Sequence, residues 1–478
     1  MQISAAIFAF MAIASIDANI IRAPIIRNHN ANNIYELAKK RHQLLSKRSF
    51  KKRDSHTASL YNDQGSQYLI QVNIGTPAQT FTVTLDTGSA DLWVPSTQCP
   101  TSACPFSLFD SSSSSTFSSL SDTFSIQYGI GNVNGTYAKD TVTIGGATVS
   151  NQQFGLATAT SDILESSTST SSNSVEANGI LGLGYPSLTE SYSQGNGGYN
   201  PFVFNLVSQN IISDPIFSIY LNSISQTGWA GEIIFGGTDP TKYEGDLAYL
   251  PVVGLTSKTS GIFGGSSSRY YYWMVYGQGL GVTNSSTGSN PSYSLGEVGT
   301  FILDTGTTLT YLPTTVATEI VAAFAGSNGY SIDSSSGVFI VDCSVYSSSA
   351  RFELKMAQSS SSNASPVTLS VPASQLVIPM DSTDVSTASV CMFGIAPLSG
   401  SGTIGSNMYL VGDSVLRSAY MVFDIGNNRI GLAASKGVGG TVTSPNGTSA
   451  DSSSNKSARM IPIITLVSIT LITSSLFM

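Results

Sequence analysis

The sequence predicts an all-β protein built of two similar lobes, and three observations support this. First, the 478 residues include 21 Tyr and 21 Phe beside many Val, Ile and Thr, which favour strands. Second, apolar and polar residues alternate over residues 68–74, 80–85 and 421–425, which is typical of half-buried antiparallel strands. Third, an eleven-residue segment occurs twice. Only two helices are expected among these strands, over residues 201–209 and 313–325.

The repeated segment keeps Leu, Asp, Thr, Gly and Pro at the same spacing in both copies. Residues 85–95 read LDTGSADLWVP, and residues 303–313 read LDTGTTLTYLP. The two aspartates, Asp86 and Asp304, are 218 positions apart. One Asp-Thr-Gly has little weight in a chain with 45 Gly. Two copies, each led by an apolar strand and followed by an aromatic residue and a proline, indicate a pair of related acidic loops.

The positions of histidine and cysteine argue against several other chemistries. All three histidines, His29, His42 and His56, lie near the N-terminus. A Ser-His-Asp triad, a Cys-His pair or a His-ligated zinc needs a histidine inside the fold. The four cysteines show no CxxC pattern, and the net charge of −8 argues against nucleic-acid binding. We therefore expect no cofactor, no metal and no nucleic-acid partner.

The first 53 residues are expected to be targeting and processing segments. Residues 1–18 carry an apolar run that is typical of a secretory signal peptide. Residues 19–53 hold ten basic residues and one acidic residue, and they end in the dibasic sites of residues 47–48 and 51–53. This segment precedes a strongly acidic body, so we interpret it as a basic propeptide that covers the body electrostatically until it is cleaved off.

The C-terminal residues are expected to carry a lipid-anchor signal. Residues 437–459 form a Ser-rich polar stalk, and residues 460–478 are mostly apolar and uncharged. A polar spacer and an apolar tail without a basic stop signal favour a GPI-anchor signal over a retained membrane span. We expect passage through the secretory pathway to the plasma membrane or cell wall. Glycosylation triplets within the lobes begin at Asn134, Asn284 and Asn363.

Further motifs accompany the repeat, and together they resemble the pepsin-like aspartic proteases over residues 66–435. Residues 128–131, YGIG, resemble the flap of that family. Residues 178–184, NGILGLG, and residues 410–413, LVGD, resemble the elements beneath its two active-site loops. The basic propeptide and the anchor signal are similar to those of the fungal yapsin branch.

This resemblance implies a bilobal pepsin-like fold with pseudo-two-fold related lobes and a central cleft. Residues 54–250 would form the N-terminal β lobe with the flap, and residues 251–436 the C-terminal β lobe. The family pattern also implies one disulfide in each lobe, Cys99–Cys104 and Cys343–Cys391.

The resemblance further implies that Asp86 and Asp304 together hold the water that attacks a peptide bond. Two close carboxyls share one proton, so one can accept a proton while the other donates. Which aspartate carries the proton is left open. Thr87 and Thr305 would lock the two loops together. Ser89 and Thr307 would support the carboxylates, and Trp93 would support Tyr128. The residues that would face the substrate are Tyr128, Gly88, Gly129, Ile130, Gly306, Thr307 and Thr308.

The expected function is that of a secreted, monomeric aspartic endopeptidase, made as a zymogen and active at acidic pH. Its own propeptide would inhibit it, with Lys39 or Lys40 as the candidate partner of the dyad. Substrate preference stays open. Ile130 stands where some basic-selective fungal relatives have Asp, which favours apolar or broad preference. The yapsin-like organisation favours basic residues, and an insertion over residues 161–177 carries three acids, namely Asp162, Glu165 and Glu176.

Two other functions remain as alternatives. The first is a catalytically silent cell-surface binding protein on the same fold, although both aspartates and Tyr128 are intact. The second is a glycoside hydrolase, which also uses two carboxylates. Only 3 Trp are present to form sugar platforms, and such an enzyme has no use for a repeated Asp-Thr-Gly.

Overall fold

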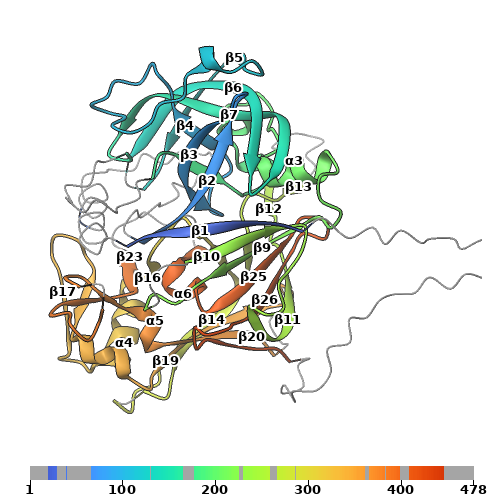
Figure 1. The fold of residues 1–478 in the computed structure, drawn as a ribbon. Helices are drawn as coiled ribbons and strands as arrows, with labels where there is room; N and C mark the ends of the chain where they lie inside the picture. The colour runs from blue at the N-terminus through green and yellow to red at the C-terminus, as the bar shows by residue number, and fades with distance from the viewer. Residues whose placement is uncertain are drawn as a thin grey trace, which may run out of the picture. The chain divides into compact units, whose positions relative to one another are not determined.

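A computed structural model describes most of the chain between residues 20 and 445, and strands dominate the described part (Figure 1). The all-β, two-lobed fold is therefore confirmed. The described residues are 20–29, 39, 66–129, 131–164, 177–225, 230–258, 266–285, 287–360, 365–382, 384–398 and 408–445.

A thirteen-stranded sheet joins strands from the beginning and the end of the described chain. Its unexpected member is β1 (Ile21–His29), which comes from the predicted propeptide and pairs with β10 on one side and β2 on the other. In spatial order the strands are β11 (Tyr243–Pro251), β26 (Arg429–Ser435), β25 (Ala419–Asp424), β9 (Ile216–Leu221), β10 (Gly231–Phe235), β1, β2 (Ser66–Ile74), β3 (Gln79–Asp86), β8 (Ile180–Gly182), β4 (Leu92–Pro95), β7 (Ala147–Ser161), β6 (Asn132–Ile144) and β5 (Ser118–Gln127).

The C-terminal lobe is built mainly on an eight-stranded sheet, and the described residues also contain two smaller, separate sheets. In spatial order the large sheet contains β23 (Ile395–Leu398), β16 (Thr310–Pro313), β24 (Met408–Val411), β15 (Ser292–Leu303), β14 (Met274–Thr283), β19 (Arg351–Ala357), β20 (Val367–Pro372) and β27 (Thr441–Thr443), and the smaller sheets contain β17 (Tyr330–Ile332), β18 (Phe339–Val341), β22 (Cys391–Phe393) and β21 (Val377–Pro379), and β12 (Leu255–Lys258) with β13 (Ser266–Arg269).

The sequence repeat corresponds to a repeat in strand pairing. In the N-terminal lobe, β8 runs parallel to β3 and antiparallel to β4. In the C-terminal lobe, β24 runs parallel to β15 and antiparallel to β16. In each lobe, therefore, the strand before the Asp-Thr-Gly and the strand after it are held by one short strand. These short strands come from the NGILGLG and LVGD motifs.

Both predicted helices are present. α3 (Phe202–Ser208) and α4 (Thr314–Ala325) lie within the expected ranges. The apolar face of α4 is buried, because Ile320, Val321 and Phe324 pack into the main core. The other helices in the described part of residues 66–445 are single turns, namely α2 (Glu190–Ser193), α5 (Ala373–Leu376), α6 (Asp413–Leu416) and the 3-10 turns η1 (Ser111–Ser113), η2 (Pro186–Leu188) and η3 (Cys343–Ser347).

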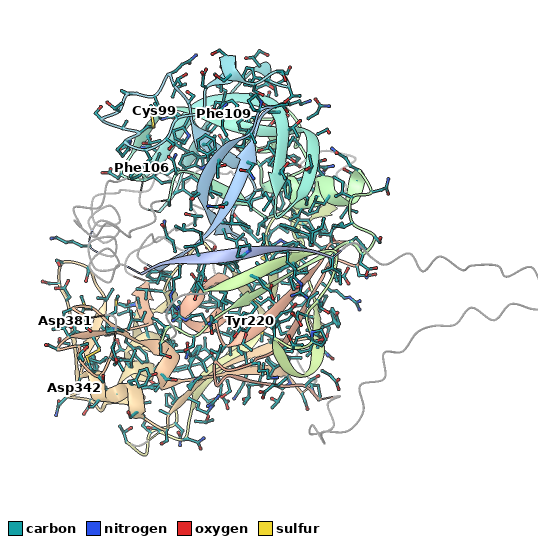
Figure 2. All side chains as sticks on the ribbon, in the orientation of Figure 1. Cys99, Phe106, Phe109, Tyr220, Asp342 and Asp381 are labelled. Carbon is teal, nitrogen blue, oxygen red and sulfur yellow. A yellow bond between two sulfur atoms is a disulfide. The ribbon has the colours of Figure 1, made fainter. Side chains whose placement is uncertain are left out.

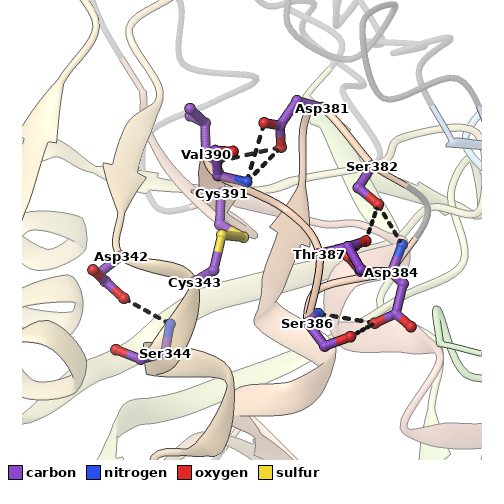
Figure 3. Close-up of a disulfide and its surroundings, with 11 residues drawn as sticks. Asp342, Cys343, Ser344, Asp381, Ser382, Asp384, Ser386, Thr387, Val390 and Cys391 are labelled. Atoms are coloured by element: carbon purple, nitrogen blue, oxygen red, sulfur yellow. Dashed lines mark hydrogen bonds between the residues drawn. A yellow bond between two sulfur atoms is a disulfide. The ribbon is translucent and has the colours of Figure 1, made fainter.

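Both predicted disulfides are confirmed. Cys99–Cys104 belongs to an apolar cluster of the N-terminal lobe (Figure 2). Cys343–Cys391 joins η3 to β22 in the C-terminal lobe (Figure 3). Beside it, the carboxylate of Asp381 accepts the backbone N–H groups of Ser389 and Val390, so polar contacts order the loop next to the disulfide.

Two segments differ from their expected roles at the ends of the lobes. β1 lies inside the large sheet, with Ala23 and Ile25 buried, rather than covering the acidic surface from outside. β27 (Thr441–Thr443) falls within the predicted stalk but pairs with β20, because its β-branched residues continue the sheet. The ordered lobe therefore extends beyond residue 436. The predicted signal peptide and the apolar tail, residues 460–478, lie outside the described residues.

Candidate active site

Asp86 and Asp304 meet where the two lobes join. Asp86 is the last residue of β3, and Asp304 follows the last residue of β15. Their side chains are 2% and 1% exposed, and the two carboxyls are hydrogen-bonded to each other. A strand end in each lobe thus delivers one carboxyl to a common buried point.

The threonines of the two Asp-Thr-Gly motifs cross-link the lobes. The Thr87 hydroxyl donates to the carbonyl of Leu303 at 2.7 Å and accepts the backbone N–H of Thr305 at 3.0 Å. The Thr305 hydroxyl donates to the carbonyl of Leu85 at 3.0 Å and accepts the N–H of Thr87 at 3.2 Å. We call these four buried bonds the threonine interlock. They fix the two aspartates relative to each other.

Glycine is required after each threonine because the opposite carboxyl lies against its backbone. A Cβ atom on Gly88 would lie 2.5 Å from the Asp304 Cγ, and one on Gly306 would lie 2.4 Å from an Asp86 oxygen. The same glycines donate their N–H groups to Asp86 Oδ1 and Asp304 Oδ1, each at 2.8 Å. Any side chain here would separate the two carboxyls.

A hydroxyl group holds the other oxygen of each carboxyl. The Ser89 hydroxyl donates to Asp86 Oδ2 at 2.5 Å, and the Thr307 hydroxyl donates to Asp304 Oδ2 at 2.7 Å. The neighbouring Thr308 is buried, and its carbonyl accepts the N–H of Ser414 at the start of α6. The nearest partners of the two aspartates are therefore equivalent.

Burial raises the pKa of both carboxyls of the dyad. Burial raises the pKa of Asp86, although donors such as Ser89 oppose this. Burial, followed by repulsion from Asp86, raises the pKa of Asp304 well above its ordinary value. The two buried carboxyls therefore share one proton, so that one member of the pair is protonated while the other is ionised. Such a pair can take a proton from water and give one to a carbonyl oxygen.

Tyr128 and Trp93 contact each other near Asp86. The indole N–H of Trp93 donates to the Tyr128 hydroxyl at 3.0 Å, and Tyr128 is 1% exposed. After burial, the charges of Asp86 and Asp91 contribute to a strong rise in the pKa of Tyr128. The backbone of the predicted flap turns tightly, since the N–H of Tyr128 donates to the Gly131 carbonyl at 2.8 Å. Gly129 is buried, and Ile130 lies outside the described residues.

Other sequence-predicted residues are spread over the chain. Asn134 and Asn284 are exposed, and so is Asp162 of the insertion. Lys39 is half-buried, and its pairing with the dyad stays a prediction. The remaining candidates, Lys40, Glu165, Glu176 and Asn363, lie outside the described residues.

Sequence reasoning missed a buried carboxylate close to the dyad. Asp91 is 3% exposed and accepts hydrogen bonds from the hydroxyls of Tyr137 and Tyr199 and from the N–H of Glu190. The repeat contained a signal for it, because the matching position in the second copy is the apolar Leu309.

No three His, Cys, Asp or Glu side chains among the described residues gather as metal ligands would. No helix in the described ranges combines the length and apolar character that a membrane crossing requires.

Comparison with known proteins matches most of the chain. The family model described as eukaryotic aspartyl protease matches residues 67–435. Mucorpepsin of Rhizomucor miehei is 34% identical over 79% of this chain and 80% of its own length. Human gastricsin is 32% identical over 77% of this chain and 81% of its own, and bovine pepsin A is 32% identical over 78% and 86%.

We predict that Thr87→Val destabilises the whole fold. Valine keeps the shape but leaves the Leu303 carbonyl and the Thr305 N–H buried without partners, at a cost of about 2–4 kcal/mol in the free energy of unfolding. Denaturant unfolding would measure this loss. Thr143→Val, at an exposed hydroxyl on β6, is the control and should change stability little. Equal stability of the two variants would show that the interlock does not hold the lobes.

We also predict that the chain is more stable at about pH 5 than at about pH 8. A carboxyl whose pKa is raised by folding binds its proton more tightly in the folded state. Its stabilising contribution is present below the ordinary value of 3.8 and is lost as pH rises through the raised pKa. Asp304→Asn should flatten this dependence in thermal unfolding. An unchanged slope would mean that Asp304 does not carry the effect.

Proposed function

The chain belongs to the eukaryotic aspartyl protease family, and we propose that it is a secreted endopeptidase, made as a zymogen and active on proteins or peptides at acidic pH. The observation that carries the catalytic part of this proposal is the buried, hydrogen-bonded pair of Asp86 and Asp304. The carboxyls contact each other directly, whereas retaining glycosidases keep theirs about 5 Å apart. The geometry therefore favours a protease over a glycoside hydrolase.

In the proposed mechanism the two aspartates exchange one proton with the substrate. The ionised aspartate takes a proton from the attacking water while the protonated aspartate gives its proton to the scissile carbonyl oxygen. The water oxygen bonds to the carbonyl carbon and forms a tetrahedral diol. A hydroxyl of the diol then returns its proton to the dyad as the carbonyl reforms. The C–N bond breaks, and the leaving amine takes a proton from the dyad.

The neighbouring groups support these steps. The N–H groups of Gly88 and Gly306, and the hydroxyls of Ser89 and Thr307, already point at the carboxyls before the substrate arrives. They lose no orientational freedom during the reaction. Tyr128 on the flap would cover the bound peptide and exclude water.

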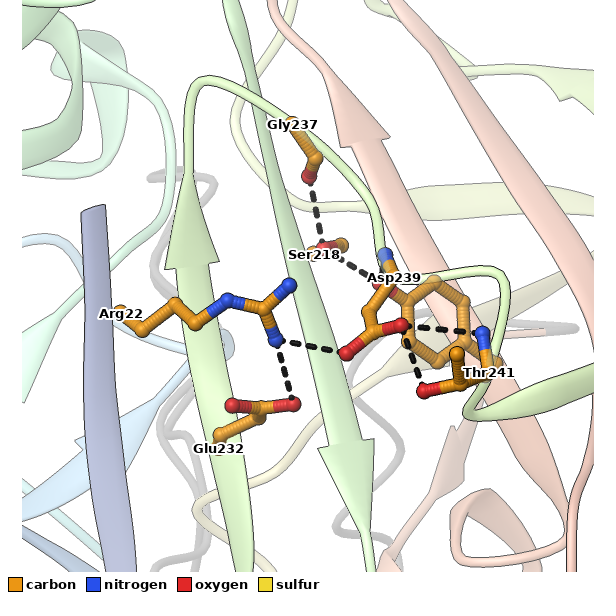
Figure 4. Close-up of polar contacts among 7 residues, drawn as sticks. Arg22, Ser218, Glu232, Gly237, Asp239 and Thr241 are labelled. Carbon is orange, nitrogen blue, oxygen red and sulfur yellow. Dashed lines mark hydrogen bonds and ion pairs between the residues drawn. The ribbon is translucent and has the colours of Figure 1, made fainter. Parts of the chain in front are cut away.

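The zymogen part of the proposal is supported by β1. Its register pairs Ile21–Ile25 with Gly231–Phe235 and Ile26–His29 with Ser66–Leu69. Arg22 binds two carboxylates of the body, with Nη1 at 2.6 Å from Asp239 and 3.1 Å from Glu232 (Figure 4). Removing the propeptide would therefore remove a paired strand as well as a surface charge. We call the contact of Arg22 with Asp239 and Glu232 the Arg22 latch.

The pH window of the Arg22 latch follows from Asp239. Burial opposes its ionisation, but hydrogen bonds from Thr241 and Arg22 lower the pKa of Asp239 to about 2. Because the pKa of Asp239 is lowered, its ionised carboxylate stabilises the contact above pH 3.8, the ordinary pKa of an aspartate. This stabilisation is lost as the pH falls toward about 2. At milder acidity the latch stays closed. We therefore propose that cleavage at residues 47–48 or 51–53, rather than acid alone, starts maturation.

The location of the protein is also a proposal. The signal peptide, the Ser-rich stalk and the apolar tail support secretion and lipid anchoring at the cell surface. The exposed triplet residues Asn134 and Asn284 are accessible to glycosylation. Basic and apolar preference at the cleaved bond both remain consistent with the exposed Asp162, and a random peptide mixture would decide between them.

We predict that Asp86→Asn and Asp304→Asn each lower proteolysis by on the order of a thousandfold or more, because a single carboxyl cannot both accept and donate the proton. Digestion of a random peptide mixture across pH by the processed enzyme measures activity, pH optimum and specificity together. Asp214→Asn changes an exposed aspartate outside the site and should retain full activity. A folded wild type that cleaves no peptide would instead favour a silent binding protein.

We predict that Arg22→Met makes the uncleaved precursor active at higher pH than the wild-type precursor, because β1 then lacks its ion pairs. Peptide cleavage by precursors with mutated dibasic sites would measure this shift. Arg429→Met is the matched control, since Arg429 also pairs with a buried carboxylate, at 2.7 Å from Asp424, but lies within the body. Equal latency of the wild-type and Arg22→Met precursors would contradict the latch.

A further inference from the structure

Asp91 breaks the symmetry between the two lobes. It stands five residues after Asp86, and Leu309 stands five residues after Asp304. Both side chains are buried, at 3% and 0% exposure. The local backbone therefore accepts an apolar residue at this position. The carboxyl of Asp91 must have a role in the N-terminal lobe that the equivalent position of the C-terminal lobe lacks.

Three donors surround the Asp91 carboxylate. The hydroxyls of Tyr137 and Tyr199 both donate to Oδ1 at 2.7 Å, and the N–H of Glu190 donates to Oδ2 at 2.8 Å. The Tyr137 hydroxyl in turn accepts the N–H of Ser191 at 3.2 Å. One side chain thus joins the segment after Asp86, the strand β6, the start of α2 and the chain that leads to α3.

These contacts reach the flap from both ends. β5 and β6 form the hairpin that carries Tyr128, and Tyr137 lies on β6 five residues beyond Asn132, where the hairpin pairs with Gln127. Trp93, two residues after Asp91, holds the Tyr128 hydroxyl at 3.0 Å. The segment that contains Asp91 and Trp93 therefore holds the tip of the flap through one side chain and its base through the other.

Stability does not explain this carboxylate. Burial raises the pKa of Asp91 even though three donors oppose the rise, so the ionised group is costly where it lies. Replacing buried charges by well-packed apolar groups is often neutral or stabilising. In the other lobe, Leu309 occupies the equivalent place. The cost at Asp91 is therefore offset by a role outside folding.

We propose that Asp91 is a positioning residue for peptide hydrolysis, because its carboxylate fixes the base of the flap hairpin and the start of α2 relative to the Asp86 loop. It contacts neither substrate nor the dyad in this role. It acts through Tyr137, so that Tyr128 closes over the dyad in a single position. This inference rests on the proposed proteolytic function.

The test is Asp91→Asn in the processed enzyme, with kcat and KM measured on a peptide that the wild type cleaves. The amide keeps the shape but has only one acceptor oxygen. If its NH2 group faces Glu190, the Glu190 N–H loses its acceptor, and if it faces the tyrosines, the hydroxyl protons of Tyr137 and Tyr199 lose theirs. We expect kcat to fall at least tenfold while KM changes less than about threefold, because flap closure acts after substrate binding. Tyr137→Phe should reproduce this split, and Tyr199→Phe should have a smaller effect on kcat.

Asp140→Asn provides the matched control. Asp140 is also a fully buried carboxylate on β6, and it accepts the Thr116 hydroxyl at 2.5 Å and the Thr141 N–H at 2.7 Å. Its loss should lower the thermal unfolding temperature and leave kcat of the folded fraction unchanged.

The outcomes separate this inference from the proposed function. If the wild type cleaves no peptide, the proteolytic function itself fails. If the wild type is active and folded Asp91→Asn keeps wild-type kcat, or if Asp91→Asn and Asp140→Asn lower kcat equally, the positioning role is wrong. If Asp91→Asn does not fold, Tyr137→Phe decides through the same split between kcat and KM.

Discussion

Two carboxyl groups buried against each other can coexist only if they share a proton, and the surrounding structure serves this condition. Asp86 and Asp304 come from strand ends in different lobes and still reach hydrogen-bonding contact. Gly88 and Gly306 leave room for the contact, and backbone N–H groups compensate the charge that remains. The threonine interlock prevents the lobes from moving apart to relieve the repulsion. Fold and chemistry therefore depend on one close approach of like groups.

The repeated framework gives the two aspartates equivalent direct hydrogen-bond partners. The two lobes differ in the residues beyond these partners. Each carboxyl receives one glycine N–H and one hydroxyl. The flap, Trp93 and the Asp91 contacts belong to the N-terminal lobe alone. A symmetric pair cannot by itself decide which member holds the proton. Burial raises the pKa of both Asp86 and Asp304, so the proton belongs to the pair as a whole.

The two-lobed fold and the aspartate pair were predictable from the sequence, because the repeated LDTG motif places each aspartate at the end of a strand. The disulfides, α3 and α4 followed from composition, end signals and the family resemblance. β1 did not, because a basic segment with dibasic sites indicates a removable cover, and its partner Phe235 lies more than 200 residues away. The Asp91 contacts also escaped, since Tyr137 and Tyr199 carry no motif. The raised pKa values of Asp86 and Asp304 depend on burial, which a sequence does not record.

The threonine interlock also bears on how a protease survives its own activity. Because the four bonds connect the backbones beside both aspartates, one lobe cannot open locally without pulling its half of the catalytic centre away. A molecule loosened enough to be digested has thus already stopped digesting others. Damage that opens one lobe therefore inactivates that molecule, so that partly unfolded molecules do not remain active.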